Sequence, residues 1–318
     1  MSIEYRPLRD IDYDLLAELF TESEIADGNP IRQVGEELRE EFESLPVDLR
    51  DHTISAWQGE HLVGATYAYH LRSDERYECC YVFGAVHPSF RAQGIGRHLL
   101  HTGVTIAGRL LTESNSQVTK VIRADVAQSN VPAMHLLERQ GLQAVRFFSD
   151  LRCPLDSIPE PRQSTTFRVI SWDYSRSEEI RKVKNLAFRD HWGTVPMSSD
   201  RWKTHTTGFG SWLDRSFVAV SPDDEIVGYL LSHRYENDDE LLGAKYAWVD
   251  NIGTLAEWRG RGVATQLLLS AMHAYREAEI EVAAINVDSD NPTGAYRLYE
   301  SLGFRPWRRR VMYQREVD

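Results

Sequence analysis

The feature that constrains this chain most is an internal repeat, because four short segments of the first half recur in the second half in the same order. The matching pairs are Tyr5–Arg9 with Phe167–Ser171, Leu62–Gly64 with Ile226–Gly228, Arg91–Gly96 with Arg259–Ala264, and Glu138–Leu142 with Glu300–Phe304. Their offsets lie between 162 and 168 residues. A constant order at a nearly constant period indicates one folding unit written twice, rather than two unrelated domains that share common turn residues.

A proline-rich segment marks the seam between the two copies. Pro154, Pro159 and Pro161 lie close together, and proline continues neither a helix nor a central strand. The length of 318 residues also corresponds to two domains of about 150 residues each. We therefore expect an N-terminal domain at residues 1–158 and a C-terminal domain at residues 159–318.

Within each copy, the hydrophobic pattern alternates between strands and helices. In the first copy the pattern predicts a strand hairpin over 53–67 and, after a further strand, a helix over 96–111. The second copy repeats this order, with a hairpin over 216–231 and a helix over 263–275. A strand, a short helix and a last strand follow in each copy. This order predicts an α/β fold (α+β mixed), in which each copy is a mostly antiparallel mixed sheet flanked by helices.

Composition and charge exclude several classes of protein. Lys and Arg total 36 against 48 Asp and Glu, and the net charge of −12 argues against a nucleic-acid-binding surface, which needs basic residues. No apolar run approaches the roughly 18–20 residues that cross a bilayer, and the first residues lack the pattern of an export signal. The three cysteines, Cys79, Cys80 and Cys153, suit neither a disulfide framework nor a zinc site. We expect a cytoplasmic protein with no metal, no membrane partner and no nucleic-acid partner.

The motif that carries chemistry is a turn between a strand and a helix, Arg-x-x-Gly-x-Gly in the first copy and Arg-x-x-Gly-x-Ala in the second. A helix that opens on small residues leaves several backbone N–H groups unpaired and pointing in one direction, which makes a seat for phosphate oxygens. Glycine allows the ligand to approach the backbone closely. The pattern is not a dinucleotide fingerprint, because Leu99 and Thr265 stand where its last glycine would be, and it is not a P-loop, because no Gly-Lys-Ser/Thr follows.

These residues resemble the GNAT acyltransferase family, in a tandem arrangement that covers nearly the whole chain. The resemblance rests on Val86–Gly96, on Thr254–Ala264 and on the downstream series Asn291, Ala295, Leu298, Tyr299, Gly303 and Phe304. It implies N-acetylation of a primary amine with acetyl-CoA as the co-substrate, whose pyrophosphate the glycine turn cradles. It also implies that the strand before the turn receives the pantetheine and the thioester carbonyl. Within the family, the chain resembles the actinobacterial tandem enzymes related to mycothiol synthase.

The resemblance assigns cofactor contacts to both copies. In the second copy they are Thr254, Leu255, Arg259, Gly260, Arg261, Gly262, Val263, Ala264 and Asn291. In the first copy they are Val86, Arg91, Gln93, Gly94, Ile95, Gly96 and Asn130. For the two asparagines, an ordinary helix cap is an equally good interpretation. Because the first copy keeps the glycine turn, one hypothesis is that it binds acetyl-CoA without reacting.

The two copies differ at the positions where catalysis would need polar groups. Aligned on the glycines, Tyr299 of the second copy stands where the first copy has Leu137, and Asp250 stands where the first copy has Val82. Equal separation along a strand keeps the side chains on the same face unless a bulge intervenes. A phenol can protonate a leaving thiolate, so we expect Tyr299 to be the general acid and the second copy to be catalytic. We expect Asp250 to accept or relay the amine proton, or to bind the cationic amine; packing of Tyr299 and a polar strand edge at Asp250 are the alternatives.

The acceptor side is less constrained by the sequence. The stretch Ala187–Gly193 resembles the segment that lines the acceptor side in the tandem enzymes, so His191 and Trp192 are candidate substrate-binding residues, with ordinary packing as the alternative. The relatives that make mycothiol differ around Trp192 and Gly193, which disfavours the mycothiol precursor and leaves antibiotic, amino-acid and polyamine acceptors open. The leading hypothesis is direct attack by a small-molecule amine in a ternary complex, by a monomer or weak dimer. A protein or peptide N-acetyltransferase and a non-catalytic acyl-CoA sensor are the alternatives.

Overall fold

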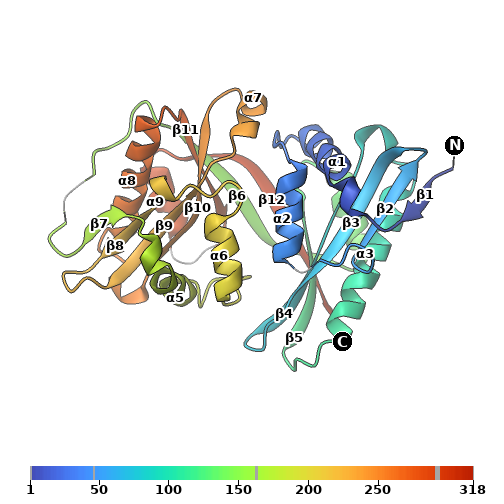
Figure 1. Cartoon of the computed structure of the whole chain (residues 1–318), viewed down its shortest axis with the longest axis horizontal. Coiled ribbons are helices and arrows are strands. Elements are labelled where there is room, and N and C mark those ends of the chain that lie inside the picture. Colours follow the sequence, from blue (N-terminus) through green and yellow to red (C-terminus); the bar gives the residue numbers. More distant parts are fainter. Residues whose placement is uncertain (1, 46, 162–163, 291–293, 318) are drawn as a thin grey trace. The chain divides into compact units, whose positions relative to one another are not determined.

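The computed structural model describes residues 2–45, 47–161, 164–290 and 294–317, which form two compact units (Figure 1). Unit 1 comprises Met1–Phe148 and Arg308–Asp318, and unit 2 comprises Ser149–Trp307. Across the described residues, no helix is both long enough and apolar enough to cross a membrane.

Unit 1 is a mixed sheet with helices on both faces. Its elements are β1 (Glu4–Arg6), α1 (Tyr13–Ala26), α2 (Gly35–Ser44), β2 (Thr53–Gln58), β3 (His61–Leu71), β4 (Tyr77–Val86), α3 (Ile95–Thr112), β5 (Thr119–Ala127), α4 (Val131–Arg139), the first part of β6 (Gln143–Pro154) and most of β12 (Arg305–Val317). Strands β1 to β4 are antiparallel in sequence order, β5 is parallel to β4, and β12 is antiparallel to β5. Side chains alternate along β3, so Tyr67 packs against α1 and α2, whereas Gly64 faces Ile95 and Leu99 of α3.

Unit 2 repeats this plan. Its elements are β7 (Arg168–Ser171), α5 (Ser177–Ala187), α6 (Ser199–Thr207), β8 (Phe217–Val220), β9 (Ile226–His233), α7 (Asp239–Leu242), β10 (Tyr246–Thr254), α8 (Val263–Glu277), β11 (Val282–Asp288) and α9 (Ala295–Ser301), with the remainder of β6 beside β11. Strands β7 to β10 are antiparallel, and β10 is parallel to β11. The predicted fold class, a mostly antiparallel mixed sheet with flanking helices in each copy, is confirmed.

In both units the parallel pair of strands is hydrogen-bonded over only part of its length. The register of β4 with β5 ends at the pair Tyr81 and Arg123, and that of β10 with β11 ends at the pair Val249 and Ile285. The last five residues of β4 and of β10 therefore continue without this partner. Backbone groups along these ends are left to face a gap between the two strands.

The last strand of each copy does not stay with its own half of the sequence. Residues Arg310–Val317 pair with β5, and Val311 and Tyr313 belong to the same core cluster as Ile122 of unit 1. The compact units thus differ from the halves 1–158 and 159–318 that the prolines indicate. A repeat in the sequence indicates which strands are equivalent, but the pairing of the last strand is decided by the surface that it buries.

Candidate active site

The glycine turn of unit 2 lies between β10 and α8. Gly260 and Gly262 have φ of +74° and +83°, in the left-handed region that favours glycine, and Gly262 is the N-cap of α8. A Cβ atom at either glycine would meet nothing within 4 Å, so the space beside the turn is open. The first N–H groups of α8, those of Val263 and Ala264 among them, have no carbonyl partner inside the helix. In unit 1, Gly94 caps α3 in the same way with φ of +86°.

The arginine of each turn binds the protein backbone. Arg259 donates from Nε to the carbonyl oxygen of Thr254 at 3.3 Å and from Nη2 to that of Ala187 at 3.0 Å. Arg91 donates from Nε to the carbonyl oxygen of Val86 at 3.2 Å, over the same five-residue separation. These arginines therefore hold the turn against the end of the preceding strand. Arg261, by contrast, has its guanidinium 4.9 Å from the ring centroid of Trp258 and belongs to the exposed part of the turn.

The backbone of β10 near the turn offers one N–H group to the gap. The resemblance assigns both Thr254 and Leu255 to the cofactor, but the N–H of Leu255 donates to the carbonyl oxygen of Val227 at 3.0 Å. Successive N–H groups of a strand point to opposite sides. The N–H of Thr254 therefore points away from β9, toward the gap between β10 and β11.

A β-bulge places Asp250. The register of β10 with β9 runs through the pair Val249 and Ser232 and then jumps to the pair Asn251 and Leu231, which leaves Asp250 as the extra residue. The corresponding strands of unit 1, β3 and β4, are paired without a shift. The structural equivalent of Val82 is thus Val249, and both are buried. The alignment of Asp250 with Val82 was wrong, because the bulge changes the side-chain parity on which it depended.

The bulge turns Asp250 toward the helices α5 and α6. Val249 packs into the core beneath α8, whereas the next residue, Asp250, contacts His205 of α6. Asn251 shares this face, since it accepts a hydrogen bond from the hydroxyl of Tyr229, whose ring packs with α5 and α6. Two neighbouring residues therefore point to the same side of the sheet, as a bulge permits and a regular strand does not.

Asp250 is held between two imidazoles, and we call His205, His233 and Asp250 the carboxylate–imidazole cluster. The Nε2 atom of His205 lies 2.9 Å from Oδ2 of Asp250, and Nδ1 of His233 lies 3.7 Å from Oδ1. Nδ1 of His233 also lies 2.9 Å from the hydroxyl of Tyr235. The Asp250 side chain keeps 25% of its surface exposed, so the cluster is open to a ligand at the carboxylate.

The charges of the cluster shift the three pKa values in different directions. Burial by itself would raise the pKa of Asp250, but the two imidazoles and the hydrogen bond from His205 outweigh it and hold the pKa well below its usual range. Burial would lower the pKa of His205, yet the charge of Asp250 and the hydrogen bond to it raise this pKa. For His233 burial dominates and lowers the pKa. Asp250 is therefore an anion near neutral pH, and His205 is the more basic imidazole.

Sequence reasoning missed His205 and His233. They come from α6 and from the end of β9, far from the glycine turn in sequence, and no spacing links them to Asp250. The three residues offer one donor atom each within 4.8 Å, which is also the donor set of a two-histidine, one-carboxylate metal site. The sequence predicts no metal in this protein. In the structure His205 is within hydrogen-bond distance of Asp250, and His233 is within hydrogen-bond distance of the Tyr235 hydroxyl.

Tyr299 lies in the core of unit 2 rather than beside Asp250. It belongs to the second turn of α9, is 6% exposed and meets Phe304 edge-on with ring centroids 6.0 Å apart. Burial raises the pKa of its phenol well above the usual range, so the group stays protonated. No hydrogen bond joins its hydroxyl to any residue that the structure describes, which leaves the proton free for a ligand. Asn291 lies outside the described residues.

The remaining predicted residues are placed as follows. His191 and Trp192 are half-buried in the connection after α5, where Nδ1 of His191 lies 2.8 Å from the carbonyl oxygen of Trp192. In unit 1, Gln93 donates to the carbonyl oxygen of Ser89, Ile95 is buried, and Gly96 lies in the first turn of α3. Asn130 caps α4 by accepting from the N–H of Ala133 at 3.1 Å.

Known proteins match this chain over both units. The model of the "Acetyltransferase (GNAT) family" matches residues 14–142 and 177–304, more than half of the chain. Curated relatives named mycothiol acetyltransferase include one from Thermobispora bispora, 29% identical over 72% of this chain and 74% of its own length, and one from Kocuria rhizophila, 28% identical over 99% and 100%.

Solved structures repeat the fold over the full length. A GCN5-related N-acetyltransferase from Sphaerobacter thermophilus superposes with a TM-score of 0.77 at 23% identity, covering 99% of this chain and 95% of its own. A tandem GNAT protein from the clavulanic acid biosynthesis pathway gives a TM-score of 0.70 at 18% identity, covering 100% and 99%. These superpositions establish the shared fold, and the family match establishes the kind of chemistry. The chain belongs to the GNAT acetyltransferase family and is a tandem acyltransferase similar to the mycothiol acetyltransferases, with acetyl-CoA as the family's co-substrate.

Proposed function

We propose that unit 2 transfers the acetyl group of acetyl-CoA to the primary amine of a small molecule, by direct attack in a ternary complex. The observation that carries this proposal is the bulge in β10. On the strand that leads directly into the glycine turn, it places an anionic carboxylate that two imidazoles from α6 and β9 flank. An acyl-transfer site needs a seat for the phosphates of the cofactor and a group that accepts the proton of the amine. Here the phosphate seat follows the end of β10, and the proton-accepting groups lie beside a residue five or more positions before it.

The cofactor would be held by backbone groups. N–H groups of Gly260 to Ala264 would receive the pyrophosphate, and Arg259 would fix the turn from behind. The N–H of Thr254 would donate to the thioester carbonyl, whose oxygen gains negative charge when the amine attacks. No covalent enzyme intermediate is required, since each cysteine is buried and burial raises the pKa of its thiol.

The reaction would then proceed in balanced steps. The bound acceptor first loses a proton to solvent, and the nitrogen of the neutral amine then attacks the carbonyl carbon and gives up a second proton to the carboxylate–imidazole cluster. The carbon–sulfur bond breaks, and the phenol of Tyr299 protonates the departing thiolate. Acetylated amine and free coenzyme A leave, the cluster releases its proton to solvent, and the Tyr299 phenolate regains one. Such proton transfers contribute about 10²- to 10⁴-fold each to a rate.

The acceptor proposed is a small cationic amine. An anionic Asp250 at a partly exposed position attracts an ammonium group, and the net charge of −12 acts in the same sense over longer distance. His191 and Trp192 are proposed to line the acceptor side. The curated relatives are named for mycothiol, so their acceptor belongs in any test panel, although the departures at Trp192 and Gly193 disfavour it here.

The test measures free thiol from acetyl-CoA against a panel of amino sugars and amino thiols, including the acceptor of the mycothiol acetyltransferases, with polyamines, amino acids, aminoglycosides and peptides. Saturable thiol release with a small amine supports the proposal. Release with peptides alone would support a protein N-acetyltransferase. Binding of acetyl-CoA without release for any amine would support an acyl-CoA sensor. Either of the last two results would overturn the proposed function.

A further inference from the structure

Two groups in the carboxylate–imidazole cluster could take the proton of the attacking amine, and their contacts distinguish them. The Asp250 carboxylate faces an imidazole with each of its oxygens, His205 at 2.9 Å and His233 at 3.7 Å. His205 uses only Nε2 for this contact. Its Nδ1 atom hydrogen-bonds no described residue, and 28% of the side chain is exposed.

We propose that His205 is the group that takes the amine proton, through Nδ1, and that Asp250 is a positioning residue for it. This inference rests on the proposed function of unit 2. With Nε2–H donated to the carboxylate, the neutral ring carries its lone pair on Nδ1. When Nδ1 accepts the proton, the imidazolium is stabilised by the adjacent carboxylate, as in other histidine–carboxylate pairs.

The surroundings of His205 suit a base near neutral pH. The titratable and charged groups that act on its ring are Asp250 of β10, His233 of β9, with ring centroids 5.4 Å apart, Lys184 of α5 and Arg201 of α6. Burial lowers the pKa of Lys184 to about 8. A bare carboxylate whose pKa lies far below neutrality is a weak base, whereas an imidazole matches the operating pH.

The experiment records kcat/KM against pH for the full chain and for His205→Gln, with acetyl-CoA affinity as a second readout. We expect His205→Gln to lose about 10²- to 10⁴-fold in kcat/KM near neutral pH, to lose the acidic limb of the profile, and to keep acetyl-CoA affinity. Asp250→Asn should keep an acidic limb but move it to lower pH, because the carboxylate is what raises the pKa of His205. His101→Gln, at an exposed position of α3 in unit 1, is the matched control and should leave the profile unchanged.

The outcomes separate this inference from the function on which it rests. If the unmodified chain acetylates no amine, both fall together. If it turns over and His205→Gln keeps its rate and its acidic limb, only the role of His205 falls. Loss of activity on treatment with a chelator, restored by Zn²⁺ alone, would also overturn the inference, because His205 would then be a metal ligand rather than a base.

A separate observation concerns unit 1, where α1 continues beyond the point at which its equivalent ends. Arg91 donates from Nη2 to the carbonyl oxygen of Ser23, as Arg259 does to Ala187, so Ser23 and Ala187 correspond. Helix α5 ends at Ala187, but α1 runs three residues further, to Ala26, with Asp27 as its C-cap. Unit 1 therefore carries almost one extra helical turn beside its glycine turn.

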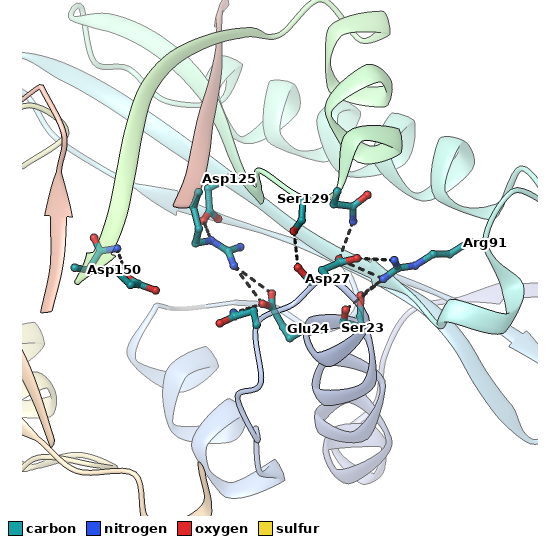
Figure 2. Close-up of polar contacts among 11 residues, drawn as sticks. Ser23, Glu24, Asp27, Arg91, Asp125, Ser129 and Asp150 are labelled. Atoms are coloured by element: carbon teal, nitrogen blue, oxygen red, sulfur yellow. Dashed lines mark hydrogen bonds and ion pairs between the residues drawn. The ribbon is translucent and has the colours of Figure 1, made fainter. Parts of the chain in front are cut away.

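The extra turn bonds to both sides of the gap between β4 and β5 (Figure 2). The Asp27 carboxylate accepts a hydrogen bond from Nη1 of Arg91 at 2.6 Å and another from Nδ2 of Asn130 at 2.7 Å. Arg91 follows β4, and Asn130 follows β5. The hydroxyl of Ser129 donates to the Asp27 carbonyl oxygen. The Asp27 side chain is 13% exposed.

A second chain of contacts holds the same helix end (Figure 2). Glu24 pairs with Arg310 of β12 at 3.2 Å, and Arg310 also pairs with Asp125 of β5. Together with the bonds of Asp27, these contacts hold the end of α1 against the glycine turn, the N-terminus of α4 and β12. In unit 2, the position after Ala187 is instead Phe188, an apolar residue.

We propose that Asp27 closes unit 1 to acetyl-CoA, so that the chain binds one cofactor molecule, in unit 2. The carboxylate lies between the glycine turn and the N-terminus of α4, across the gap that would admit the acyl-bearing arm. It engages the Asn130 amide that the family resemblance assigns to that arm. This proposal replaces the hypothesis, suggested by the glycine turn of the first copy, that unit 1 binds acetyl-CoA without reacting.

Calorimetric titration of the full chain with acetyl-CoA tests this proposal. We expect a stoichiometry of one for the unmodified chain and a second, weaker site in Asp27→Ala. Glu113→Ala, an exposed acidic residue at the end of α3, is the matched control and should keep a stoichiometry of one. A stoichiometry of two in the unmodified chain would overturn the proposal, and so would an unchanged stoichiometry in Asp27→Ala.

Discussion

At the scale of single residues, the chemistry proposed for unit 2 depends on groups whose surroundings shift their pKa values in opposite directions. The Asp250 carboxylate is kept ionised by two imidazoles, and the Tyr299 phenol is kept protonated by burial. An acyl transfer needs one group that accepts a proton and another that donates one; in the proposed mechanism the carboxylate–imidazole cluster around Asp250 accepts the proton and Tyr299 donates one. The sequence could name Asp250 and Tyr299 by residue type, but their protonation follows from the packing around them.

Replacement of Tyr299 by Phe tests the donor. We expect the rate of the acyl-transfer step to fall by about 10²- to 10⁴-fold, because the thiolate would leave without a proton. Single-turnover measurement of free thiol isolates this step from product release. Tyr296→Phe is the matched control, since Tyr296 is only half-buried on the same short helix. A single-turnover rate that is equal in both variants would show that Tyr299 only packs in the core.

At the scale of elements, one inserted residue separates two otherwise equivalent strands. Strand β4 pairs regularly with β3, whereas β10 bulges at Asp250 and places Asp250 and Asn251 on one face. The tight packing around the bulge supports this geometry, since a Cβ on Gly253 would come within 2.7 Å of the Tyr229 ring. The bulge is a local rearrangement of a strand whose remaining length still resembles its counterpart.

Deletion of Asp250 should convert β10 into a regular strand like β4. We expect the deletion variant to fold and to bind acetyl-CoA, because β4 shows that this fold accepts an unbulged strand, but to lose acetyl transfer by at least as much as Asp250→Ala. Thermal unfolding, calorimetry and thiol release together measure the three properties. Full turnover in the deletion variant would contradict the role given to the bulge.

At the scale of the whole molecule, each compact unit contains strand residues from both halves of the sequence. Val311 and Tyr313 are fully buried among residues of α3, β5 and α4 in unit 1. Leu151 and Cys153 are buried with Phe304 in unit 2. Stability of unit 1 therefore depends on the last residues of the chain.

Val311→Ala tests this dependence in the full chain. We expect a loss of about 1–3 kcal/mol in the stability of unit 1, from lost burial and the cavity left behind. Hydrogen exchange followed by mass spectrometry should show faster exchange in β3 to β5 and little change in β8 to β10. Glu316→Ala, an exposed position on the same strand, is the control. Faster exchange confined to unit 2 would contradict the assignment of β12 to the core of unit 1.

How far the sequence reached is clear from particular residues. Gly94 and Gly262 indicated the N-termini of α3 and α8, because a turn of small residues between an apolar strand and an amphipathic helix is typical of a helix start. Tyr299 and Asp250 were predicted by comparing one copy with the other, and the bulge shows that Asp250 does not stand opposite Val82. His205 and His233 were not found, because residues that meet only through the tertiary fold leave no common spacing in the chain.

The sequence by itself determined the repeat, the fold of each copy, the glycine turns and hence the family, since all of these are local patterns of backbone preference and hydrophobic period. Only the tertiary structure decided which strand completes which sheet, that Asp250 stands in a bulge rather than opposite Val82, and that Asp27 bonds across the gap in unit 1. These depend on surfaces and charges brought together from distant positions. Their free energies arise only when the chain has folded, so no local pattern contains them.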